Sequence, residues 1–104
     1  MKTVIVGSGS VGYHLAEQLI KEGQDIIIID QDPDAVAYAT SHLDCLVLTG
    51  AGNDPEILKR ADVGEADFFI SVTNSDEINM IACFLMASEF PGPKSIARVR
   101  NLFA

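Results

Sequence analysis

The chain has 104 residues, and its seven Lys or Arg against fifteen Asp or Glu give a net charge of −8. A protein that binds a nucleic-acid duplex needs a basic surface to displace counterions, so this balance excludes a nucleic-acid partner. With 48% hydrophobic and 21% charged residues, the composition is that of one globular domain. The longest uncharged apolar stretch, Met80 to Ala87, is too short to span a bilayer, which excludes direct membrane insertion.

The first part of the chain alternates strand and helix patterns. The apolar run Val4–Val6 is a predicted strand, and Ser10–Lys21 is a predicted helix because apolar residues recur along one face. A second strand is expected at Asp25–Asp30, whose unbroken isoleucine run is typical of a parallel strand covered on both faces. Pro33–Ser41 is the second predicted helix, with Asp32 as its cap.

The same alternation continues to the end of the chain. Cys45–Thr49 is the third predicted strand, and a cap followed by proline within residues 53–56 begins a third helix. Ala66–Val72 is the fourth strand. Ser75–Glu89 is the fourth helix, with Ser75 as its cap, and Ser95–Val99 is the fifth strand.

Strands that alternate with helices across short connections predict an α/β fold with a parallel sheet and right-handed crossovers. A glycine motif after the first strand selects the doubly wound, Rossmann-like form, with strand order 3-2-1-4-5. Ligands of such sheets lie beyond the carboxyl ends of the strands, where the winding reverses between the first and fourth strands. A complete dinucleotide domain usually adds a helix and a strand. We therefore expect residues 1–104 to be the front part of a longer chain, truncated after strand five.

The glycine motif is the strongest functional signal, and it reads Gly7-Ser8-Gly9-Ser10-Val11-Gly12. Gly7 permits the tight turn, Gly9 allows a phosphate to approach the backbone, and Gly12 lets the helix pack closely. The free amides of the helix N-terminus favour an anion, and the hydroxyls of Ser8 and Ser10 are further donors. The motif predicts a site for the adenosine diphosphate part of a nucleotide. An ordinary glycine-rich turn is the alternative.

Asp30 ends the second strand, where its carboxylate is expected to accept both hydroxyls of a ribose. A 2′-phosphate about 4 Å from that charge would meet a repulsion of about 4 kcal/mol at an effective dielectric constant near 20. No arginine follows in Gln31-Asp32-Pro33 to offset it. The pattern therefore favours NAD(H) over its 2′-phosphorylated form, with a solvated or helix-capping aspartate as the alternative.

Polar and small residues follow the third and fourth strands. Thr73 and Asn74 bring hydrogen-bonding side chains to the ligand side of the sheet, or else serve the turn into the Ser75 cap. Gly50 to Gly52 is small enough for an adenine to approach, or it is a flexible loop.

Two features near the end of the chain are unusual. Arg98 and Arg100 are expected on one face of the fifth strand, because side chains alternate along a strand. Arg98 is then expected to contact either a phosphate or an acidic residue of a partner subunit, and an arginine exposed to solvent is the alternative. The fourth helix is apolar nearly all round, so it needs a second burial partner. That partner is either another part of the chain or a second subunit, and we favour a subunit.

No catalytic machinery is indicated by the sequence. His14 and His42 lack companions at ligand spacing, so no metal site is expected. No His, Lys or Tyr is placed as a general acid beside a nicotinamide. A ligand-sensing regulatory module that is not an enzyme is the preferred hypothesis, and the cofactor-binding half of an NAD-dependent dehydrogenase is the alternative.

Several blocks of sequence resemble one family, the amino-terminal nucleotide-binding (KTN or RCK) domain of TrkA potassium uptake proteins. They are the glycine motif, Asp30, residues 50–58, Ala66-Asp67, the block from Val72 to Asn79, and Ile96-Ala97-Arg98-Val99-Arg100-Asn101. The resemblance covers essentially the whole chain. The blocks ending in Asn79 and Asn101 are more specific than the glycine motif.

The resemblance implies a cytoplasmic regulatory subunit, peripheral to the inner face of the membrane, that controls a potassium transporter membrane subunit. It implies binding of NAD(H), with ATP or ADP as alternative ligands, and assembly into a homo-oligomer, a dimer or higher. The family's binding positions that match this sequence are Gly7 to Val11, Asp30, Thr73, Asn74 and Arg98.

Overall fold

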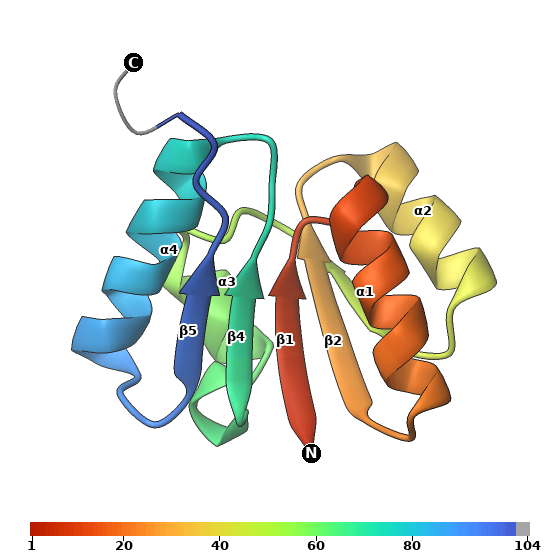
Figure 1. The fold of residues 1–104 in the computed structure, drawn as a ribbon, viewed down its shortest axis with the longest axis horizontal. Helices are drawn as coiled ribbons and strands as arrows, with labels where there is room; N and C mark the ends of the chain where they lie inside the picture. The colour runs from red at the N-terminus through yellow and green to blue at the C-terminus, as the bar shows by residue number, and fades with distance from the viewer. Residues whose placement is uncertain (102–104) are drawn as a thin grey trace.

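The computed structural model describes residues 1–101 and contains one parallel sheet of five strands (Figure 1). The strands follow the order β3-β2-β1-β4-β5, which confirms the predicted doubly wound topology. Their bounds are Lys2–Val6 for β1, Asp25–Asp30 for β2, Leu46–Thr49 for β3, Phe68–Ser71 for β4 and Lys94–Ala97 for β5.

Within the described residues four α-helices connect these strands, and they lie in two layers on opposite faces of the sheet (Figure 1). Their bounds are Ser10–Lys21 for α1, Pro33–His42 for α2, Pro55–Arg60 for α3 and Asp76–Glu89 for α4. Three helix starts carry side-chain caps, because Asp32, Asp54 and Ser75 each accept a hydrogen bond from a backbone N–H of the first turn.

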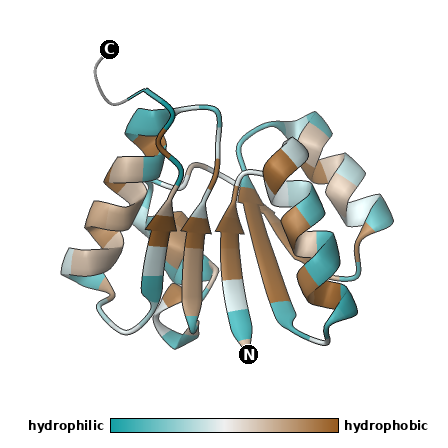
Figure 2. Cartoon of the chain, in the orientation of Figure 1, coloured by the Kyte–Doolittle hydropathy of each residue, from teal (hydrophilic) through white to brown (hydrophobic). Residues whose placement is uncertain are grey.

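The core has two halves because side chains alternate between the faces of a strand. On β1, Val4 and Val6 point to the face covered by α3 and α4, whereas Ile5 points to the face covered by α1 and α2. Phe69 joins the first half and Ile28 the second, and all five side chains are at most 1% exposed. Figure 2 shows the resulting apolar strands, and it shows apolar residues along the visible side of α4 as well.

The fifth strand is shorter than the sequence predicts. It ends at Ala97, so the expectation that Arg98 and Arg100 share a face of that strand is wrong. The ladder continues for one contact, since the N–H of Arg98 donates to the carbonyl of Ser71 at 3.0 Å. The chain then leaves the sheet, and the N–H groups of Arg100 and Asn101 donate to the side chain of Asp76.

Helix α4 has a buried face and an exposed apolar face. Asn79, Ala82 and Met86 face the sheet and are fully buried. Met80 and Ile81 are each 46% exposed and Phe84 is 72% exposed. The second apolar surface expected on this helix is therefore present. Within residues 1–101, no helix is long and apolar enough to cross a membrane.

Candidate functional site

A cavity of about 490 Å³ opens beyond the carboxyl ends of the strands, at the point where the sheet reverses its winding between β1 and β4. Segments that follow all five strands line it. The lining includes Gly7, Gly9, Ser10 and Val11 after β1, Asp30 to Asp32 at the end of β2, Gly50 to Gly52 after β3, Thr73 to Ser75 after β4, and Arg98 after β5. Its size falls within the range of small-molecule sites.

The structural role of glycine differs among the three motif positions. Gly7 has a φ of +102°, and a Cβ there would lie 3.0 Å from the backbone N of Thr73. A Cβ at Gly12 would lie 1.7 Å from the carbonyl oxygen of Gly7, so only glycine lets α1 begin against the turn. Gly9 meets nothing within 4 Å, which leaves open space beside its backbone at the N-terminus of α1.

Asp30 is held by three hydrogen bonds from the chain. Its Oδ2 accepts from the backbone N–H of Ser8 at 2.7 Å and from the Ser8 hydroxyl at 3.1 Å, and its Oδ1 accepts from the N–H of Asp32 at 2.9 Å. The carboxylate thus ties the glycine turn to the end of β2. It remains part of the cavity lining.

The small residues after β3 pack tightly as well as lining the cavity. A Cβ at Gly50 would lie 2.5 Å from the side chain of Ile57, and one at Gly52 would lie 2.5 Å from the side chain of Val6. The Gly50 N–H also donates to the carbonyl of Asp30 at 2.9 Å. This segment is therefore fixed by core contacts and is not simply a flexible loop.

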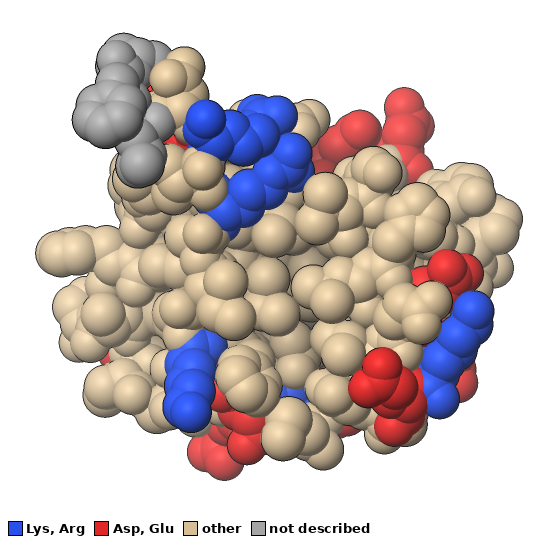
Figure 3. Space-filling model, viewed as in Figure 1, with Lys and Arg blue, Asp and Glu red and all other residues tan. Residues whose placement is uncertain are grey.

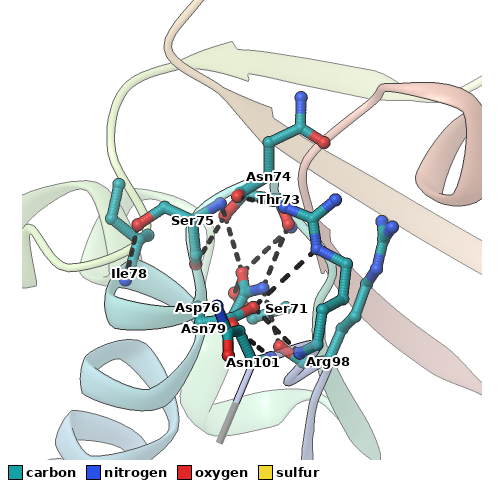
Figure 4. A network of polar contacts seen from close by, with 10 residues as sticks. Ser71, Thr73, Asn74, Ser75, Asp76, Ile78, Asn79, Arg98 and Asn101 are labelled. Carbon is teal, nitrogen blue, oxygen red and sulfur yellow. Dashed lines mark hydrogen bonds and ion pairs between the residues drawn. The ribbon is translucent and has the colours of Figure 1, made fainter. Parts of the chain in front are cut away.

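The loop after β4 is organised by a buried asparagine (Figure 4). Asn79 Oδ1 accepts from the N–H of Thr73 at 2.9 Å, from the Thr73 hydroxyl at 2.7 Å and from the Ser71 hydroxyl at 2.9 Å. Its Nδ2 donates to the carbonyl of Thr73 at 3.1 Å and to that of Arg98 at 2.9 Å. One side chain thus fixes two edges of the cavity, Thr73 and Arg98.

Asn79 was not among the site residues that the sequence predicted. The available signal was its position three residues before Ala82 and seven before Met86, which places it on the inward face of α4. A polar side chain on such a face needs buried partners. The ends of β4 and β5 supply them.

The chain after β5 is attached to the start of α4. Asp76 accepts from the N–H of Arg100 at 3.1 Å and of Asn101 at 2.9 Å, and the Arg100 guanidinium donates to the carbonyl of Asn74. These backbone donors, above all that of Arg100, hold the pKa of the Asp76 carboxyl below its ordinary value.

The cavity edge carries both signs of charge. Figure 3 shows basic side chains above the ends of β4 and β5, and acidic side chains along the same edge on the α2 side. The charged side chains in the cavity lining are the carboxylates of Asp30 and Asp32 and the guanidinium of Arg98. An anion is therefore favoured toward β5 and hydroxyl donors are favoured toward β2.

Most of the predicted site residues lie around this one cavity. Those that line it are Gly7, Gly9, Ser10, Val11, Asp30, Thr73, Asn74 and Arg98. Ser8 and Gly12 are buried beside it, where Ser8 bonds to Asp30 and Gly12 packs against Gly7.

A doubly wound parallel sheet, with a glycine turn and an acidic strand end at its switch point, defines a Rossmann-type nucleotide-binding domain. The chain belongs to the TrkA-N domain family, which matches residues 3–102. A relative from Halomonas elongata, named Trk system potassium uptake protein TrkA, is 45% identical over 100 residues. That match covers 96% of this chain and 22% of the relative, so the chain spans about a fifth of the relative's length.

Two solved structures share the fold. One, described as Shewanella denitrificans Kef CTD in AMP bound form, has a TM-score of 0.82 at 21% identity, and covers 95% of this chain and 59% of its own. The other is the NAD(P)-binding domain of an exopolyphosphatase-related protein from Archaeoglobus fulgidus. It has a TM-score of 0.84 at 16% identity, and covers 96% of this chain and 74% of its own.

Proposed function

We propose that this chain is a nucleotide-sensing regulatory domain of a potassium uptake system and that it does not catalyse a reaction. The observation that carries the proposal is the path of the cavity, which runs from the carboxylate of Asp30 past the open backbone at Gly9 to Arg98. A nucleotide presents the same sequence of groups, a ribose diol followed by phosphates. The polar groups lining the cavity are suited to binding and orienting such a ligand.

Each part of the ligand has a proposed position. The phosphates lie against Gly9, Ser10 and Val11 at the N-terminus of α1, where free N–H groups and the helix dipole favour negative charge. The ribose lies at Asp30. The adenine lies toward Gly50 to Gly52, whose backbone is fixed by contacts with Ile57 and Val6.

The far end of the ligand is proposed to meet Thr73, Asn74 and Arg98. Asn79 holds the N–H of Thr73 and the carbonyl of Arg98, so these residues are positioned before a ligand arrives. NAD(H) is the proposed ligand, with ATP or ADP as alternatives, because all of them share the adenosine diphosphate part. The carboxylates of Asp30 and Asp32 favour an unphosphorylated ribose.

The regulatory role is supported by membership of the TrkA-N domain family and by relatives named as potassium uptake proteins. We propose a potassium transporter membrane subunit as the partner, with this domain at the cytoplasmic face of the membrane. A nucleotide that binds one assembly state better than another would shift the population toward that state. The proposed homo-oligomer contact is the exposed apolar face of α4, formed by Met80, Ile81 and Phe84.

Calorimetric titration of the chain with NADH, NAD, ATP and ADP tests the proposal. We expect saturable binding of at least one of them, with the ligand chemically unchanged after prolonged incubation. If none of the four nucleotides binds at millimolar concentration, the proposed sensing role is contradicted. Turnover of NADH in the presence of simple carbonyl substrates would favour the dehydrogenase alternative.

A further inference from the structure

The hydrogen bonds around Asp30 leave too few acceptor positions for a ribose. A carboxylate has about four acceptor sites. Three donors of the described chain occupy Asp30, namely the N–H and hydroxyl of Ser8 on Oδ2 and the N–H of Asp32 on Oδ1. A ribose that binds through both of its hydroxyls needs two acceptor sites, so one of these three donors must leave.

The three donors differ in their freedom to move. The N–H of Ser8 is fixed by the turn that begins at Gly7, whose own N–H donates to the carbonyl of Ile29 at 2.8 Å. The N–H of Asp32 is fixed by the turn into α2, where the Asp32 side chain caps the helix. The Ser8 hydroxyl, in contrast, leaves Asp30 by rotation about one side-chain bond.

The lengths of the bonds agree with this ranking. The bond from the Ser8 hydroxyl is 3.1 Å, whereas the two backbone bonds are 2.7 and 2.9 Å. An O–H donor to a carboxylate prefers a shorter distance than an N–H donor does. The hydroxyl therefore makes the weakest of the three contacts.

Resting on the proposed function, we propose that the Ser8 hydroxyl is an internal competitor for the ribose-binding acceptor of Asp30. It takes the place of a ribose hydroxyl in the free protein and must rotate away when a ribose diol binds. Ser8 thereby lowers the affinity for every ligand that uses both hydroxyls. Its side chain is a specificity-determining group and does not bind the phosphates.

The test compares two ligands that differ only in the diol. ADP and 2′,3′-dideoxy-ADP are titrated calorimetrically into the wild-type chain, Ser8→Ala and the matched control Ser41→Ala. Ser41 is an exposed serine of α2 whose hydroxyl bonds to the carbonyl of Ala37 at 2.9 Å, away from the cavity lining.

Ser8→Ala is expected to bind ADP about three- to tenfold more tightly than the wild type, because the ribose no longer has to displace a hydrogen bond. Its affinity for the dideoxy ligand should stay unchanged, and Ser41→Ala should match the wild type with both. Unchanged or weaker ADP binding by Ser8→Ala would overturn the inference, as would an equal gain with both ligands. If neither ligand nor NADH binds any of the three proteins, the proposed function itself fails, and the inference fails with it.

A structural measurement covers the case in which Ser8→Ala does not fold. In a crystal structure of the wild-type chain with ADP, the Ser8 hydroxyl should lie beyond hydrogen-bonding distance of Asp30 Oδ2 while the ribose hydroxyls contact both carboxylate oxygens. A Ser8 hydroxyl that keeps its contact while both ribose hydroxyls are bound would refute the competition.

Discussion

Asn79 Nδ2 donates a hydrogen bond of 2.9 Å to the carbonyl oxygen of Arg98 and so joins the first turn of α4 to the end of β5. The same side chain accepts the N–H of Thr73 through its Oδ1. Because Asn79 is fully buried, its amide group depends on these protein partners for its hydrogen bonds. The arrangement of this side of the cavity therefore depends on one amide group.

Replacing Asn79 with leucine should lower the free energy of unfolding by about 3 kcal/mol, because the buried hydroxyl of Ser71 and part-buried groups of Thr73 and Arg98 lose their partner while the volume changes little. Urea unfolding followed by circular dichroism measures the change. Asn101→Leu is the control, since that residue is exposed and bonds to Asp76 only through its backbone N–H. A loss as small as that of the control would show that the network has little effect on stability.

Substitutions at two of the motif glycines should have different effects, one on folding and the other on nucleotide binding. Gly12→Ala places a Cβ against the Gly7 carbonyl and should destabilise the chain by about 3 kcal/mol or more. Gly9→Val projects its side chain into open space, so the chain should fold with a similar melting temperature but lose nucleotide binding. Thermal unfolding and calorimetric titration give the two readouts. Nucleotide binding retained by Gly9→Val would contradict the proposed phosphate position.

Asp30→Asn removes the charge proposed to exclude a 2′-phosphate while keeping the shape of the side chain. NADH binding should weaken about tenfold, because hydrogen bonds to an ionised acceptor are the stronger ones, and NADPH should become a better ligand relative to NADH. Competition titrations measure the ratio of the two affinities. Asp44→Asn, an exposed residue before β3, is the control with the same change in charge. An unchanged ratio would show that charge repulsion by Asp30 does not exclude NADPH. The proposed position of the ribose would then need a separate test.

Asp76 should contribute a pH-dependent part of stability. Its pKa in the folded chain lies below the ordinary 3.8, with the backbone N–H of Arg100 as the leading cause. A carboxyl whose pKa is lowered by folding stabilises the chain fully above its unfolded pKa, and the contribution is lost as the pH falls through the folded pKa. The difference in melting temperature between the wild type and Asp76→Asn should therefore be constant near neutral pH and shrink below about pH 4. A difference that stays constant to pH 2.5 would show that Asp76 is not the titrating group.

The exposed face of α4 is proposed to hold a second copy of the chain. Phe84→Glu should shift the protein toward monomers in sedimentation velocity measurements without lowering its stability by more than about 0.5 kcal/mol, because Phe84 is 72% exposed. Glu77→Gln, an exposed residue of the first turn of the same helix, is a control. An unchanged sedimentation profile of Phe84→Glu would show that the exposed face of α4 is not the contact between copies of the chain.

The main features of the fold follow from local sequence signals. The isoleucine run of β2 and the Asp-Pro pairs at residues 32–33 and 54–55 predict a strand and two helix starts, and the structure confirms each. Such signals act over a few residues, so they are present in the sequence itself. The order of the strands is predicted by the glycine motif after the first strand, which is typical of the doubly wound form, and the structure confirms it.

Features that depend on distant contacts were not predictable in the same way. The end of β5 at Ala97 reflects the attachment of Arg100 and Asn101 to Asp76, which lies 24 and 25 residues earlier. The contact between Ser8 and Asp30 likewise joins residues 22 positions apart. No local pattern reports such pairs, because they form only when the sheet assembles.

The cavity draws on residues from Val6 to Arg98 and on the ends of all five strands. No fragment that lacks a strand contains the whole binding surface, so ligand affinity and global folding are thermodynamically linked. A nucleotide present at a hundred times its dissociation constant would add about 2.7 kcal/mol to the free energy of unfolding. The melting temperature of the chain is then itself a measure of occupancy, and a thermal-shift screen of unmodified nucleotides would rank its ligands without any label.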